Sequence, residues 1–74
     1  MDIYELIMNG YAEKAYVENS VGGNYTEAHF FDNDYNYTTK DLAMHVVIKE
    51  FDVNGIVKNE IVMSRDVNMS KKSK

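Results

Sequence analysis

The apolar and polar residues at the start of the chain alternate with the period of an α-helix. In residues 2–17 the apolar side chains fall on one side of a helical projection at about 100° per residue, and a polar, mostly acidic stripe falls opposite. Asp2 is a candidate N-cap, with Glu5 three residues later as its capping-box partner. Gly10 lies inside this stretch, and an internal glycine costs a helix ~1 kcal/mol relative to alanine. The pattern predicts an amphipathic helix over 2–17, with a short helix that breaks near Gly10 as the alternative.

The middle of the chain reads as turns around one strand. Residues 19–24 contain two glycines and predict a turn. Residues 25–31 carry aromatic and Thr side chains that favour a β-strand. The Asp- and Asn-rich residues 32–36 predict a loop, because these side chains satisfy their own backbone in turns. Residues 38–41 can cap a helical turn around positions 42–43.

The strongest local signal is Asn54-Gly55 between two β-rich runs, residues 45–53 and 56–65. Asn and Gly adopt the positive φ angles of a two-residue type I′ turn at the least cost, so this dipeptide predicts a β-hairpin. The expected cross-strand pairs are Val53 with Ile56, Phe51 with Lys58, Lys49 with Glu60, Val47 with Val62, Ile48 with Ile61, and Val46 with Met63. Opposite charges meet at Lys49 and Glu60, which supports this register. Apolar residues occupy both faces of the hairpin, so we expect it to be central in its sheet.

Together these elements predict a single α+β domain over residues 1–66, in which an N-terminal helix packs on a small antiparallel sheet that ends in the Asn-Gly hairpin. Residues 67–74 are polar and basic without periodicity, and predict a flexible tail. A chain of 74 residues lies near the lower size limit for a self-sufficient core. Partner binding or self-association is therefore expected.

Composition excludes several classes of protein. The chain has no Cys, which excludes a disulfide-stapled miniprotein and a Cys-ligated zinc module. Its longest apolar runs are far shorter than the ~20 residues of a membrane span. The first residues carry acids at Asp2 and Glu5, unlike the basic start of a secretory signal. These features predict a cytoplasmic protein that does not contact the membrane.

The search for catalytic and metal-binding residues gives a negative expectation. His29 and His45 are the two histidines, and the Asp32-x-Asp34-x-Asn36 run imitates the start of a calcium-binding EF-hand loop. Tyr37 and Ala43 then stand where that loop needs a glycine and a bidentate acid. The chain also lacks a nucleophile motif and a phosphate-binding glycine loop. We predict a non-enzymatic protein with no catalytic residue, metal or cofactor.

Charge is concentrated in the first half of the chain. The net charge is −4, and residues 1–39 contain seven acids against one base. An acidic surface repels nucleic-acid phosphates and attracts basic proteins, while tyrosines supply contact anchors. The candidate partner-binding residues are Glu13, Glu18, Glu27, Asp32, Asp34, Tyr25, Tyr35 and Tyr37. The alternative interpretation is that the acids only keep a small protein soluble.

In size, acidity, lack of Cys and Pro, and a tyrosine-rich acidic half, the chain resembles the small host-takeover proteins of bacteriophages. Among these it is most similar to the phage inhibitors that occupy the DNA-binding surface of a basic host protein, such as the histone-like nucleoid protein HU. The resemblance rests on Glu13, Glu18, Glu27, Asp32, Asp34 and the neighbouring tyrosines. It implies a DNA-mimicking inhibitor in the host cytoplasm that binds a DNA-binding protein and no nucleic acid directly.

A second hypothesis comes from the predicted hairpin. Its strands, residues 45–53 and 56–65, could pair with another sheet edge in a homodimer or in a larger complex. The chain would then be a structural or assembly module. The two hypotheses differ in their salt dependence, since apolar and backbone pairing persists at high salt and charge-driven inhibition does not.

Overall fold

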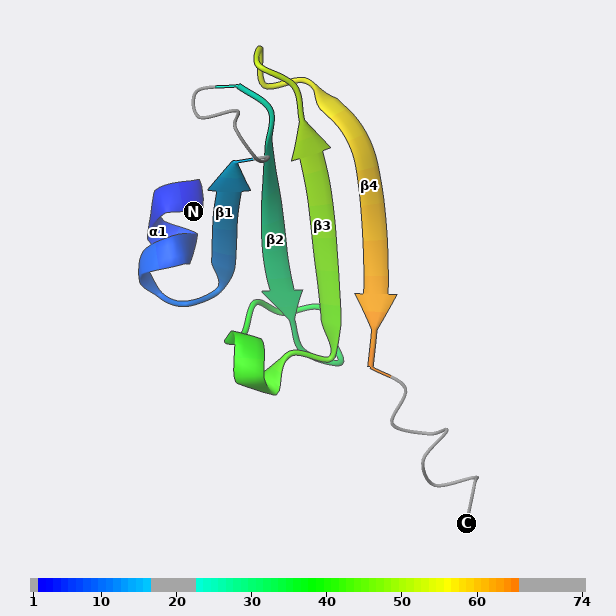
Figure 1. Ribbon diagram of the computed structural model, residues 1–74. Coiled ribbons are helices and arrows are strands. Elements are labelled where there is room, and N and C mark those ends of the chain that lie inside the picture. The colour runs from blue at the N-terminus through cyan, green and yellow to red at the C-terminus, as the bar shows by residue number, and fades with distance from the viewer. Residues whose placement is uncertain (1, 17–22, 66–74) are drawn as a thin grey trace.

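The computed structural model describes residues 2–16 and 23–65, and in these ranges it forms one short α-helix beside a four-stranded antiparallel sheet (Figure 1). The elements are α1 (Ile3–Met8), β1 (Ala12–Tyr16), β2 (Tyr25–Phe31), the 3-10 turn η1 (Lys40–Leu42), β3 (His45–Phe51) and β4 (Val57–Ser64). The strand order is β1-β2-β3-β4, so each strand pairs with the next one along the chain. The predicted α+β class is consistent with this arrangement.

Helix α1 begins as predicted and ends early. The Asp2 carboxylate accepts a hydrogen bond from the Glu5 N–H at 2.9 Å, and the Glu5 carboxylate accepts one from the Asp2 N–H at 3.2 Å, which completes the capping box. The helix stops at Met8, and Gly10 adopts a φ of 81° that an α-helix cannot contain. The prediction of a helix over 2–17 is therefore wrong, and the shorter alternative is correct. Residues 12–16 form β1 instead.

The strand predicted over residues 25–31 is present as β2, and the helical turn predicted after residue 38 is present as η1. Thr39 occupies the N-cap position of η1, where its hydroxyl donates to the Asp41 carboxylate at 2.6 Å. Most of the predicted 19–24 turn, and the predicted tail at 67–74, lie outside the described residues.

Strands β3 and β4 pair antiparallel with Lys49 opposite Glu60 and Ile48 opposite Ile61, as the expected register requires. Their connection differs from the predicted two-residue type I′ turn. Five residues, Asp52–Ile56, join the strands, and Gly55 has a positive φ of 80° whereas Asn54 does not.

The side chain of Asp52 explains this longer connection. Its Oδ1 accepts hydrogen bonds from the N–H groups of Asn54 at 2.8 Å and Ile56 at 3.0 Å. The Asp52 N–H donates to the Ile56 carbonyl at 2.9 Å, and this bond closes a loop of three residues, one more than predicted. The register shifts beside this loop, so Phe51 pairs with Val57. The predicted pairs of Val53 with Ile56 and Phe51 with Lys58 are wrong.

The two faces of the sheet differ in character. One face, here called the aromatic face, carries Tyr25, Glu27, His29 and Phe31 of β2 together with the residues that pair with them. The other, the aliphatic face, carries Ala28 and Phe30 of β2 with their partners on β3 and β4. These partners are Ile48, Val46, Ile61 and Met63.

The core lies at the β1–β2 side of the molecule. The buried apolar residues of the described chain are Leu6, Ala12, Phe30 and Ala43, which come from α1, β1, β2 and the residue after η1. Burial is greatest in β2 and declines through β3 to β4, in which every residue is exposed. The expectation that the hairpin is central is wrong for β4, which is an edge strand.

Candidate functional site

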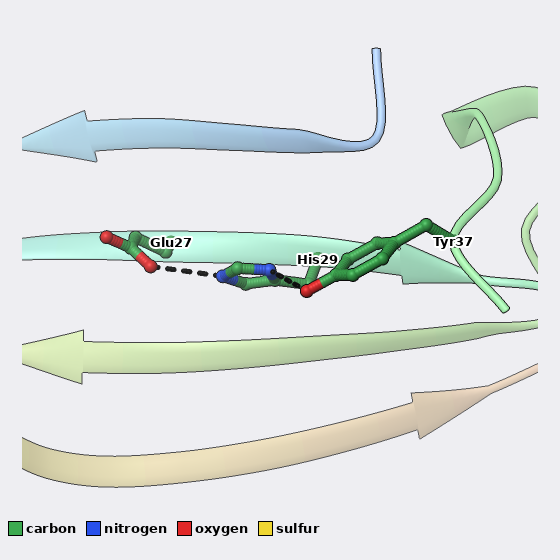
Figure 2. Close-up of polar contacts among 3 residues, drawn as sticks. All are labelled: Glu27, His29 and Tyr37. Atoms are coloured by element: carbon green, nitrogen blue, oxygen red, sulfur yellow. Dashed lines mark hydrogen bonds and ion pairs between the residues drawn. The ribbon is translucent and has the colours of Figure 1, made fainter. Parts of the chain in front are cut away.

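The polar side chains with the most buried contacts lie on the aromatic face of β2. Glu27 and His29 stand two residues apart on that strand, so both side chains point to the same side of the sheet. The Nε2 atom of His29 lies 3.0 Å from the Glu27 carboxylate, and its Nδ1 atom lies 3.2 Å from the Tyr37 hydroxyl (Figure 2). His29 is only 8% exposed. The three side chains form a hydrogen-bonded row of carboxylate, imidazole and phenol.

This row holds a loop against the sheet. A neutral imidazole that donates from Nε2 to Glu27 has Nδ1 free to accept from the Tyr37 hydroxyl. Burial and the nearby Glu27 carboxylate raise the pKa of Tyr37 above its ordinary value of 10.0, so this phenol stays protonated rather than becoming a nucleophile. The Tyr37 ring also packs on Phe31 with 4.6 Å between ring centroids. The arrangement therefore positions the segment after β2.

The predicted acidic residues occupy three separate places. Glu27 is engaged on the aromatic face, whereas Glu13 pairs with Ala28 and therefore points to the aliphatic face. Glu13 is also within 3.5 Å of the Lys40 ammonium group. Asp32 and Asp34 lie in the loop that follows β2. Glu18 is outside the described residues.

Asp32 is engaged by its own loop. Its carboxylate accepts hydrogen bonds from the N–H groups of Asn36 at 3.0 Å and Asp34 at 2.8 Å. The Asn36 N–H is the main cause that lowers the pKa of Asp32 below its ordinary value, and the Asp34 N–H adds to it. This carboxylate shapes the turn. The four candidate acids in the described residues are therefore divided between the two faces of the sheet and this loop.

The predicted tyrosines pack against their own sheet. Tyr25 stacks on Phe51 at 4.9 Å between ring centroids, and the Lys14 ammonium lies 4.5 Å from its ring. Tyr35 stacks on His45 at 4.1 Å, at the opposite end of the sheet. Tyr25 and Tyr37 thus share the aromatic face with Glu27, and Tyr35 packs at the end of that face, whereas Glu13 lies on the aliphatic face.

The second hypothesis from the sequence offered both hairpin strands for pairing with another sheet, and the structure places one of them, β4, at the edge. Large apolar side chains on both of its faces are exposed, namely Val57, Ile61, Val62 and Met63, with exposed fractions of 43% to 54%. β4 is the last strand of the sheet order, so one side of its backbone has no neighbouring strand within the described residues. The sequence feature that marks this edge is the presence of apolar residues on both faces of the predicted hairpin. The same feature also fits a strand buried inside the sheet, so the sequence alone does not distinguish the two positions.

The backbone groups on the free side of β4 can be identified. The Arg65 N–H donates to the Met44 carbonyl at 2.8 Å, in the same register as the Met63–Val46 pair. Because N–H and C=O groups alternate in direction along an antiparallel strand, Met63 and Ile61 also face β3. The groups that face outward belong to Lys58, Glu60, Val62 and Ser64.

A shallow hollow of about 250 Å³ adjoins the end of β4. Its lining residues are Lys40, Ala43, Met44, Val46, Met63, Ser64 and Arg65. η1 therefore lies over the aliphatic face beside Val46 and Met63. Within the described ranges, no group of three or more His, Cys, Asp or Glu side chains is placed to hold a metal ion.

Comparisons of the chain with protein-family models, with curated proteins and with solved structures found no match. The resemblance to phage inhibitors accordingly stays a prediction. Among residues 2–16 and 23–65, no helix has the length and apolar content needed to cross a membrane.

Proposed function

We propose that this protein is a non-enzymatic assembly module that binds a protein partner by extending its sheet at β4. The observation that carries the proposal is an eight-residue edge strand that is exposed along its whole length and carries large apolar side chains on both faces. An exposed, long, apolar edge strand is a template for pairing with another strand. In this mode of recognition the backbone supplies hydrogen bonds and the side chains supply selectivity.

The distribution of charge along β4 indicates which part of the strand makes the contact. Lys58 and Glu60 lie in its first half, where the register shift after Glu50 also disturbs the pairing. Charges and bulges are features that protect an edge from unwanted pairing. Ile61, Val62 and Met63 follow without a charge, so the second half of β4 supplies the apolar part of the contact with a partner.

The gain from covering these side chains is substantial on the scale of a small domain. Complete burial of one Val, Ile or Met side chain contributes ~1.5–3 kcal/mol. Ile61, Val62 and Met63 are about half exposed, so covering them contributes several kcal/mol before the entropy cost of association. This contribution does not depend on charge.

The DNA-mimicking inhibitor predicted from the sequence is a different proposal, and it requires a continuous anionic patch. The net charge of −4 supports it. However, Glu13, Glu27 and Asp32 lie on different parts of the molecule, and each contacts a neighbouring group. This dispersal favours β4 as the contact instead. The two proposals are separated by ionic strength, because binding by an anionic patch weakens as salt is raised.

The test compares two valine substitutions that add the same charge at exposed positions. Val62→Lys places an ammonium group on the free edge, and Val53→Lys places one in the loop between β3 and β4, where Val53 is 62% exposed. Both variants should remain folded. Sedimentation should show self-association or binding of a purified partner for the wild-type and Val53→Lys chains at low and high salt, and the loss of that association for Val62→Lys.

Two results would contradict the proposal. One is association that survives Val62→Lys unchanged, because the contact then lies elsewhere. The other is association that high salt abolishes in all three chains, which would point to the acidic inhibitor.

A further inference from the structure

We infer that the strand that pairs with β4 is β4 of a second copy of this chain, antiparallel and related by a two-fold axis at Ile61. This inference rests on the proposed function, since it names the occupant of the same edge. Each copy would contribute the outward N–H and C=O groups of Lys58, Glu60, Val62 and Ser64. The result is a continuous sheet through both copies.

The backbone restricts where the axis can lie. Outward groups must meet outward groups, and these occur at every second residue of β4. A two-fold axis must therefore pass beside a residue rather than between two residues. With the axis at Ile61, Lys58 meets Ser64 and Glu60 meets Val62, so all four outward positions are paired within the strand.

The neighbouring axes are less favourable. An axis at Glu60 sets the two Glu60 carboxylates directly opposite each other, and like charges in that position are destabilising. An axis at Val62 leaves Lys58 opposite position 66, beyond the end of β4. An axis at Asn59 places Val62 opposite Ile56, which belongs to the connecting loop and not to the strand. Only the axis at Ile61 avoids like charges and keeps every outward group on a strand partner.

The side chains agree with this register. On the aliphatic face, Ala28, Ile48 and Ile61 form one cross-strand row. With the axis at Ile61, this row continues directly into the equivalent row of the second copy. Met63, which is 54% exposed, then lies opposite Asn59 and next to Ile61 of the second copy. The exposed aliphatic residues of β4 would thus cover one another.

The other edge of the sheet explains why assembly would stop at two copies. Helix α1 lies beside β1, at the far side of the sheet from β4 (Figure 1). Strand β1 is also shorter, with five residues against eight. Pairing of β4 with β4 uses the same surface on both copies and closes after one contact.

Cysteine cross-linking tests both the occupant and the register, because the chain contains no Cys of its own. Single variants Glu60→Cys, Ile61→Cys and Val62→Cys are oxidised in the full-length protein, with Val53→Cys in the connecting loop as the control. Two residues opposite each other in a non-hydrogen-bonded pair have Cα atoms about 4.5 Å apart, within the range that a disulfide spans. We expect Ile61→Cys to form a covalent dimer at least tenfold faster than the other three variants.

The other outcomes distinguish an error in the pairing register from an error in the identity of the partner. Fastest cross-linking at position 60 or 62 would overturn the register while β4 remains the contact. If no variant cross-links faster than Val53→Cys, and the wild-type chain sediments as a monomer, the second copy is overturned as occupant. In that case, the proposed function still stands if Val62→Lys abolishes binding of another protein. If Val62→Lys changes no association, both the proposed function and the inference about the second copy are wrong.

Discussion

At the scale of single residues, two aspartates build the same kind of loop at opposite ends of the sheet. The carboxylates of Asp32 and Asp52 each accept hydrogen bonds from the N–H groups two and four residues later. The residue three positions after each aspartate has a positive φ, which is 64° at Tyr35 and 80° at Gly55. Tyrosine pays a cost of about 1–2 kcal/mol in this conformation, and its stack on His45 offsets part of it. The aspartate, more than the Asn-Gly dipeptide, determines these turns.

The first residue-scale prediction concerns the Tyr37 hydroxyl. Tyr37→Phe leaves His29 Nδ1 without its partner, so the free energy of unfolding at pH 7 should fall by ~1 kcal/mol. The pKa of Tyr37 is raised in the folded state, so its contribution is complete below pH 10 and is lost as the pH rises through the folded-state pKa. Urea unfolding at several pH values should therefore show wild type and Tyr37→Phe converging above about pH 10.

The matched control is Tyr4→Phe, since Tyr4 is 67% exposed on α1. That substitution should leave both the stability at pH 7 and the alkaline profile of the wild type unchanged. Equal effects of Tyr4→Phe and Tyr37→Phe would show that the row of Glu27, His29 and Tyr37 does not stabilise the fold.

At the scale of elements, a strand could be predicted where its own residues favour β-structure, as in β2. Strand β1 could not be predicted, because it is stabilised by pairing with β2. β2 contains Tyr, Thr and Phe, which favour a strand wherever they lie. β1 reads Ala-Glu-Lys-Ala-Tyr, a sequence with better helix than strand propensity. It forms a strand because the turn at Gly10 directs it along β2, where Lys14 pairs with Glu27. Such long-range pairing is invisible to a local pattern.

A prediction at this scale tests which backbone groups of β4 face outward. The Val62 N–H faces the free edge, so Val62→Pro removes no hydrogen bond within the chain, whereas Met63→Pro removes one to Val46. At protein concentrations low enough to keep the chain monomeric, Met63→Pro should lower the free energy of unfolding by at least ~1 kcal/mol more than Val62→Pro. Urea titration followed by circular dichroism measures both. Equal losses in the free energy of unfolding for the two variants would contradict the assignment of the outward-facing N–H groups, and the proposed pairing register depends on that assignment.

At the scale of the whole molecule, the candidate site shows why nearness in sequence does not predict a shared surface. Glu13 and Glu27 were expected on one acidic patch. Successive residues of a strand point to opposite faces, and the register that sets Glu13 against Ala28 sends these two carboxylates to different sides of the sheet. The register depends on where β1 begins, which in turn depends on the end of α1. The apolar residues of β4 could be recognised from sequence, but their place at an edge follows only from the strand order.

The weak burial of the isolated chain leads to a last prediction about its stability. The buried apolar residues of the described part are four, and two of them are alanines, so a single copy has a small core. If β4 pairs with β4 of a second copy, folding is coupled to dimerisation, and mass action makes the unfolding midpoint depend on protein concentration. The thermal midpoint of the wild-type chain should rise across a hundredfold increase in concentration, and that of Val62→Lys should stay constant. A constant midpoint for the wild type would mean that one copy reaches its full stability alone, and a second copy would then be excluded as the occupant of the β4 edge.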